Sequence, residues 1–79
     1  MVEIKILGTG CKKCRNLENK VRELIAANNI DAVVEKVTDI QEIINYGIMV
    51  TPGLVINEKV KSYGIIPESD KLIGWLKEN

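Results

Sequence analysis

The 79-residue chain contains no histidine and no phenylalanine, and its only aromatic residues are Trp75, Tyr46 and Tyr63. Its 11 Lys and Arg residues balance its 11 Asp and Glu residues, so no net charge attracts nucleic acid or anionic lipid. Charged residues interrupt the apolar run at 2–7, which excludes both a signal-peptide core and a membrane span there. These absences predict a cytoplasmic protein that binds neither nucleic acid nor membranes.

The apolar pattern predicts one α/β domain spanning residues 1–79. A chain of this length allows a single small core, which isoleucine, leucine and valine must supply. Apolar residues alternate along the first segment and then recur at helical spacing, so a helix is expected to join two parallel strands. The first half is expected to contain a strand at 2–7, a helix from the cysteines to Asn28, and a second strand at 30–37. A short helix should follow, capped by Thr38 or Asp39 and ended by Gly47. The second half should contain a strand opened by Pro52, a turn at Asn57-Glu58, an edge strand at 59–63 and a helix capped by Ser69.

The only two cysteines, Cys11 and Cys14, stand between the first strand and the first helix. At the start of a helix this spacing places the two α-carbons roughly 5 to 6 Å apart, within the range of about 4.4 to 6.8 Å found in disulfides. The pair can therefore open and close without backbone movement. Two thiolates could also hold a soft metal ion such as Cu(I). Two incidental buried cysteines are the plainest alternative.

The two thiols are not expected to be equivalent. Free amides of the first helical turn point toward Cys11. Positive charge comes from Lys12, Lys13 and Arg15. Such a setting lowers the pKa of a thiol below its usual value of about 8.5. We therefore expect Cys11 to attack a substrate disulfide, and Cys14, one turn inward, to attack the mixed disulfide and release the reduced substrate.

The chain resembles the small glutaredoxin-like members of the thioredoxin superfamily found in archaea and bacteria. The residues that carry the resemblance are Cys11-Lys12-Lys13-Cys14 after the first strand, Thr51-Pro52 before the third, and the amphipathic terminal helix. The resemblance spans the whole chain. It implies a thioredoxin-like βαβαββα fold, with a four-stranded mixed sheet in the order 2-1-3-4 and helices on both faces. It also implies a thiol–disulfide oxidoreductase, and we expect a monomer without cofactor or metal.

The resemblance further implies a cis peptide bond between Thr51 and Pro52, in a loop that lies against the two cysteines. The backbone of Thr51 would bind the substrate strand, a mode that recognises extended peptides without reading their sequence. Gly10, Lys12 and Lys13 are the further substrate-binding candidates. The implied partners are proteins that contain disulfides, together with an electron donor.

Several residues depart from the better-known relatives. Thioredoxins and glutaredoxins do not have two lysines between their cysteines, and Lys5 stands where thioredoxins carry a buried carboxylate. We interpret Lys5 as a surface residue of the first strand. Tyr63-Gly64-Ile65-Ile66 replaces the glutathione-binding segment of glutaredoxins, which favours a flavoprotein disulfide reductase or another dithiol protein as electron donor. Tyr46 and Met49 are candidates for the rim of the thiol groove.

A soft-metal chaperone is the alternative from another functional class. Heavy-metal-associated domains also place two cysteines at this spacing between a first strand and a first helix. They have methionine where this chain has Thr9, and they end in a strand where 69–77 predicts a helix. A closed zinc site would need ligands from a second chain, because no histidine or second cysteine pair is present. Thiol–disulfide exchange is therefore the favoured hypothesis, and Cu(I) binding is the alternative.

Overall fold

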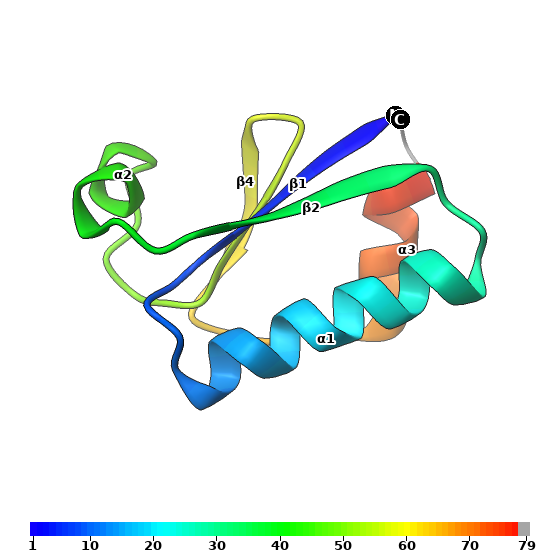
Figure 1. The fold of residues 1–79 in the computed structure, drawn as a ribbon, viewed down its shortest axis with the longest axis horizontal. Coiled ribbons are helices and arrows are strands. Elements are labelled where there is room, and N and C mark those ends of the chain that lie inside the picture. Colours follow the sequence, from blue (N-terminus) through cyan, green and yellow to red (C-terminus); the bar gives the residue numbers. More distant parts are fainter. Residues whose placement is uncertain (78–79) are drawn as a thin grey trace.

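Four strands form one mixed sheet in the order β2-β1-β3-β4 in a computed structural model that describes residues 1–77. Figure 1 shows two longer helices below this sheet and a short helix at its left end. The elements are β1 (Val2–Leu7), α1 (Lys12–Ala27), β2 (Ala32–Val37), α2 (Ile40–Asn45), β3 (Gly53–Ile56), β4 (Lys59–Tyr63) and α3 (Ser69–Lys77).

Strand β1 lies inside the sheet and pairs with a neighbour on each side. It runs parallel to β2 along its whole length, the arrangement that a crossover helix produces. Its other edge is antiparallel to β3, with Leu7 opposite Gly53. Asn57 and Glu58 both adopt left-handed φ values, of 50° and 68°, which suit a two-residue hairpin turn from β3 into β4. The predicted fold and strand order are confirmed.

The larger apolar cluster, called the main core below, lies between the sheet and the helices α1 and α3. Leu17 and Val21 on α1 are four residues apart, as are Leu72 and Leu76 on α3, so each pair lies on one helical face. The buried members are Val2, Ile4, Ile6, Leu17, Val21, Leu54, Ile56, Leu72 and Leu76. Because these residues come from both ends of the chain, the main core holds β1 and α1 together with α3.

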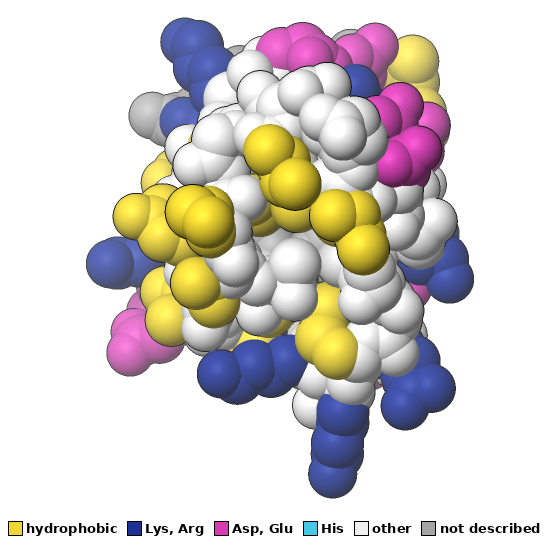
Figure 2. Space-filling model, turned by 90° about the vertical axis from the view of Figure 1, so that its left-hand side faces the viewer, with side chains coloured by type: hydrophobic (Ala, Val, Ile, Leu, Met, Phe, Trp, Pro, Cys, Tyr) yellow, Lys and Arg dark blue, Asp and Glu magenta, His cyan; other side chains and the backbone are white. Residues whose placement is uncertain are grey.

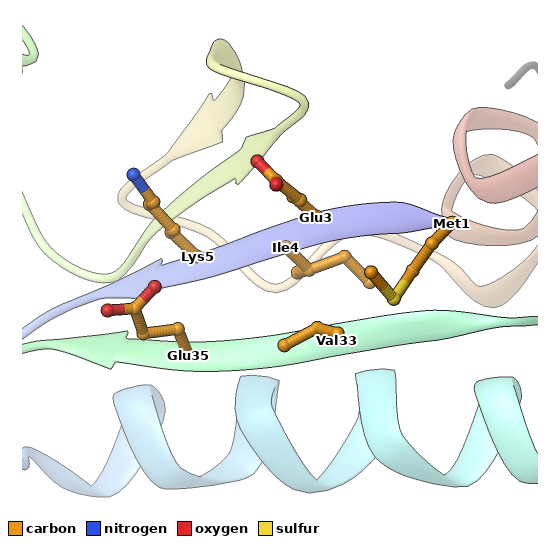
Figure 3. Close-up of a pocket in the computed structure, with 6 residues that line it drawn as sticks. All are labelled: Met1, Glu3, Ile4, Lys5, Val33 and Glu35. Carbon is orange, nitrogen blue, oxygen red and sulfur yellow. The ribbon is translucent and has the colours of Figure 1, made fainter.

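Helix α2 packs on the opposite face of the sheet, at the end where β1 leads into the cysteines. The buried residues beneath it, called the small core below, are Leu7, Val37, Ile43, Ile48 and Val55. The remainder of that face is open, and Glu3, Lys5 and Glu35 project from it around a shallow hollow of about 300 Å³ (Figure 3). Helices therefore cover both faces, as predicted, but they cover them unequally.

Two helix caps were predicted from side chains, with different outcomes. Asp39, rather than Thr38, caps α2, since its carboxylate accepts the amide hydrogen of Gln41 at 2.8 Å. Ser69 was expected to cap α3 but is already helical, and this prediction is wrong by one residue. The first carbonyl of the α3 ladder is that of the preceding residue, which accepts the amide hydrogen of Leu72 at 3.1 Å.

Candidate active site

A disulfide joins Cys11 and Cys14 at the start of α1, where the two α-carbons are 5.0 Å apart. Cys11 is the N-cap residue, with extended backbone, and its sulfur accepts the amide hydrogen of Cys14 at 3.2 Å. Its carbonyl accepts the amide hydrogen of Arg15 at 3.0 Å and so begins the helix. The sulfur of Cys11 therefore lies at the helix N-terminus, where the helix dipole favours negative charge.

The two sulfur-bearing residues differ in access to solvent. Cys11 is exposed, whereas only 5% of Cys14 is exposed. Cys14 packs closely on Gly8, because a β-carbon at Gly8 would collide with the Cys14 sulfur. Gly10 precedes the pair with a φ of 90° and is exposed. A partner molecule can thus reach the sulfur of Cys11 directly, while that of Cys14 is covered.

The loop before β3 lies beside the cysteines, as the family resemblance implied. The Thr51–Pro52 peptide bond is cis. The β-carbon of Thr51 is 3.9 Å from the position that a β-carbon on Gly8 would occupy, so the two loops are neighbours. Pro52 is buried and its carbonyl accepts the amide hydrogen of Gly64 at 2.8 Å. Within residues 1–77 the backbone of Thr51 forms no hydrogen bond, so an incoming strand could pair with it.

Lys12 and Lys13 open α1 and are both exposed. The ammonium group of Lys13 lies 3.4 Å from the carbonyl oxygen of Gly64, so this side chain reaches the loop between β4 and α3. The first turn of α1 contains no acidic residue. Positive charge therefore stands beside the exposed sulfur without an acidic neighbour in that turn.

Aliphatic side chains of α2 and of the loop before β3 form a groove that Thr9 and Thr51 also line. Its lining residues are Thr9, Ile40, Ile43, Ile44, Ile48, Met49 and Thr51, around a volume of about 220 Å³. Ile40, Ile44 and Met49 are 63%, 53% and 95% exposed. Figure 2 shows hydrophobic side chains gathered on this end of the molecule, with Lys and Arg side chains along the lower edge. We call this feature the aliphatic groove.

The aliphatic groove was only partly predicted. Met49 does line it, but Tyr46 turns toward the open sheet face instead. Of the three isoleucines on α2, only Ile43 is buried, whereas Ile40 and Ile44 are exposed. The spacing of four between Ile40 and Ile44 carried the missed signal, because it places two large apolar side chains on one side of the helix.

Lys5 binds across the open face of the sheet. Its ammonium group donates to Tyr46 Oη at 2.9 Å and to Glu58 Oε1 at 2.7 Å. The hydrogen bond to Glu58, followed by that to Tyr46, raises the pKa of Lys5. The bond from Lys5 lowers the pKa of Glu58. Lys5 thus links β1 to the β3–β4 turn and to the end of α2, rather than facing the cysteines.

The described residues bear on the metal-binding alternative. Within residues 1–77 no three His, Cys, Asp or Glu side chains come together as metal ligands. The chain ends in helix α3 where heavy-metal-associated domains have a strand. None of the helices within residues 1–77 has the length and apolar character of a membrane span.

Comparison with known proteins decides between the two families. A family model described as a thioredoxin domain matches residues 2–77. The chain belongs to the thioredoxin family. It is similar to a thioredoxin of Methanocaldococcus jannaschii, with 38% identity over 77 residues that cover 98% of this chain and 88% of the relative. It is also similar to a thioredoxin of Methanothermobacter thermautotrophicus, with 33% identity over 72 residues, 91% of this chain and 94% of the relative.

The fold is shared more widely within the thioredoxins. The germline-specific thioredoxin Deadhead of Drosophila melanogaster superimposes with a TM-score of 0.67 at 18% identity, covering 98% of this chain and 79% of that one. This likeness concerns the fold alone. The family match and the archaeal relatives identify the activity as thiol–disulfide oxidoreduction. The favoured hypothesis is confirmed, and no finding supports the Cu(I) alternative.

Proposed function

We propose that the protein reduces protein disulfides, with Cys11 as the nucleophile and Cys14 as the resolving thiol. The thiolate of Cys11 attacks one sulfur of a substrate disulfide, and the other substrate sulfur leaves as a thiolate. Cys14 then attacks Cys11, the mixed disulfide breaks, and the second substrate thiolate leaves. Two electrons pass from the dithiol to the substrate, and the Cys11–Cys14 disulfide forms.

The contrast in exposure between the two bonded cysteines carries this assignment. An attacking sulfur must meet a disulfide on another protein, and Cys11 is exposed at a helix N-terminus. A resolving sulfur needs to reach only its neighbour, and Cys14 is covered but bonded to Cys11. A positive setting beside Lys12 and Lys13 supports the same order, since it favours a thiolate at Cys11.

The substrate segment binds across the loop formed by Thr51 and Pro52. The unpaired backbone of Thr51 suits an extended strand, whose main chain supplies the hydrogen bonds. The aliphatic groove beside Thr51 accepts an apolar side chain of that segment. Gly10, Lys12 and Lys13 contact the substrate on the side of the helix, where the two lysines attract acidic side chains.

The partners follow from the same chemistry. A flavoprotein disulfide reductase or another dithiol protein returns two electrons to the Cys11–Cys14 disulfide. One domain with one such pair suffices for the cycle, so the protein acts as a monomer. The cytoplasm, which keeps thiols reduced, is the compartment that suits a dithiol donor.

Trapping the mixed disulfide tests the assignment of the two sulfurs. Cys14→Ser should accumulate a covalent complex between Cys11 and a disulfide-bonded protein such as insulin, detected by mass spectrometry and reversed by a reductant. Cys11→Ser should accumulate no such complex, because the remaining thiol is covered. Accumulation with Cys11→Ser and not with Cys14→Ser would reverse the roles.

A further inference from the structure

A small cavity lies directly beside the resolving sulfur. Its volume is about 160 Å³, and Cys14, Glu18, Lys36 and Thr38 are among the residues that line it. A water molecule needs only about 10–15 Å³ of such space. Glu18 is the one carboxylate among the lining residues of this cavity. The cavity therefore joins a covered thiol to a carboxylate through space that water can enter.

Glu18 is held in place from two sides. Its Oε2 accepts a hydrogen bond from Nε of Arg22 at 2.9 Å, and its Oε1 lies 3.7 Å from Nζ of Lys36. Its side chain is 12% exposed, against 52% for Arg22 and 60% for Lys36. Arg22 comes from α1 and Lys36 from β2, so the carboxylate is fixed to both elements that border the cavity.

The spacing of Cys14 and Glu18 suits a water-mediated contact. They stand four residues apart on α1, which places their β-carbons roughly 5 to 6 Å from each other on one helix face. The structure shows no direct hydrogen bond between these two side chains, and a water in the cavity that both residues line would bridge them. The sulfur of Cys14 is otherwise enclosed, with only 5% of the residue exposed.

We propose that Glu18 accepts the proton of Cys14 through water during the resolving step, an inference that rests on the proposed function. As the Cys14 sulfur attacks Cys11, its S–H bond breaks and the proton passes by water to the Glu18 carboxylate. The Cys11–Cys14 bond forms while the bond from Cys11 to the substrate sulfur breaks, and the substrate leaves as a thiolate. Glu18 then returns the proton to solvent. Because Glu18 acts on the Cys14 thiol only through this water, it is a positioning residue.

Three cations face this carboxylate and cavity. Arg22 and Lys36 bond to Glu18, and Arg15 also lines the cavity. They place positive charge around the carboxylate that receives the proton. The uncharged hydroxyl of Thr38 is a further polar group on the cavity wall.

The two chemical steps can be followed separately with dithiobis-nitrobenzoate, a chromogenic disulfide. Attack by Cys11 of the reduced protein releases the first coloured thiolate, and attack by Cys14 releases the second. Glu18→Gln should slow the second release about tenfold near pH 7, less than direct general-base contacts give because water intervenes. As the pH is raised toward strongly alkaline values, the difference should fall below about twofold, since thiols then ionise without the help of a base.

Matched variants separate this proton role from other effects. Glu23→Gln makes the same change at an exposed position of α1 outside the cavity and should leave both releases unchanged. Glu18→Asp keeps a carboxylate and should recover part of the rate. If Glu18→Gln slows the second release equally at every pH, or does not slow it at any pH, the inference is overturned while the proposed function stands. If the reduced wild-type protein gives no first release, Cys11 does not attack disulfides and the proposed function is wrong.

Discussion

The main core and the small core stabilise different parts of the molecule. The main core joins β1 and β3 to α1 and α3. The small core holds α2 and the segment before the Thr51–Pro52 bond against the opposite face of the sheet. Outside the small core, the exposed residues Ile40, Ile44 and Met49 line the aliphatic groove. Packing that stabilises the fold is thus separated from packing that shapes the substrate-facing surface.

The comparison explains how 79 residues can serve both purposes. A small domain buries little surface and needs nearly all of its apolar residues in its core. The side chains that form the main core are accordingly almost fully buried. The face with the small core is covered by α2 only near the cysteines, and its open part carries Glu3, Lys5 and Glu35 beside the half-exposed Val33. Three exposed large apolar residues, Ile40, Ile44 and Met49, lie together where the substrate is proposed to bind.

Truncation of one residue in each core should show the separation most strongly. Leu17→Ala should lower the free energy of unfolding by about 3–5 kcal/mol, because it opens a cavity among fully buried neighbours. Ile43→Ala should cost about 2 kcal/mol, since α2 is short and borders solvent. Urea unfolding measures both. The rate of insulin reduction per folded molecule should fall in Ile43→Ala and stay constant in Leu17→Ala. Equal rates in the two variants would refute the separate roles of the main core and the small core.

A substitution in the aliphatic groove should have a smaller effect, confined to binding. Ile44→Ser should change the free energy of unfolding by no more than about 0.5 kcal/mol, because the side chain is 53% exposed. Its KM for insulin should rise about three- to tenfold, since a side chain that would bury apolar area is lost. Val33→Ser is the matched control, because Val33 is 48% exposed on the open sheet face. A KM change shared by both variants would contradict a role for the groove.

The smallest effect is expected at the ion pair on the open face. The pKa of Glu58 is lowered by Lys5, so the pair stabilises the fold above the ordinary pKa of 4.5, and this contribution is lost as pH falls through the folded pKa. The pKa of Lys5 is raised, so the contribution is also present below 10.5. Glu58→Gln should lower Tm slightly at neutral pH and match the wild type in strong acid. Glu35→Gln, on the same face, should show no such pH dependence.

Elements and their order could be predicted because their signals are local. The alternation in β1, the capping carboxylate of Asp39 and the turn at Asn57-Glu58 each depend on neighbours within a few residues. The cysteine motif, the Thr51-Pro52 dipeptide and the terminal helix carried the family resemblance, which implied the cis bond that the structure shows. The fold and the chemistry of the pair were therefore accessible before any coordinates.

Contacts between distant segments could not be predicted in the same way. Lys5 and Tyr46 are 41 residues apart, and no local pattern indicates that their side chains meet. Likewise, periodicity shows that α2 has apolar residues but not which of them the sheet covers. The cavity between Cys14 and Glu18 also depends on β2, which supplies Lys36. Such features arise only when the elements pack.

Gly64 links the two walls of the active site. Its amide hydrogen bonds to the carbonyl of Pro52, and its own carbonyl lies near the ammonium group of Lys13. Its φ of 75° is left-handed, and a β-carbon there would press on Val50 at 3.0 Å. A single backbone unit, 51 residues beyond Lys13, therefore connects the start of α1 to the cis-proline loop, although Gly64 itself takes no part in the chemistry.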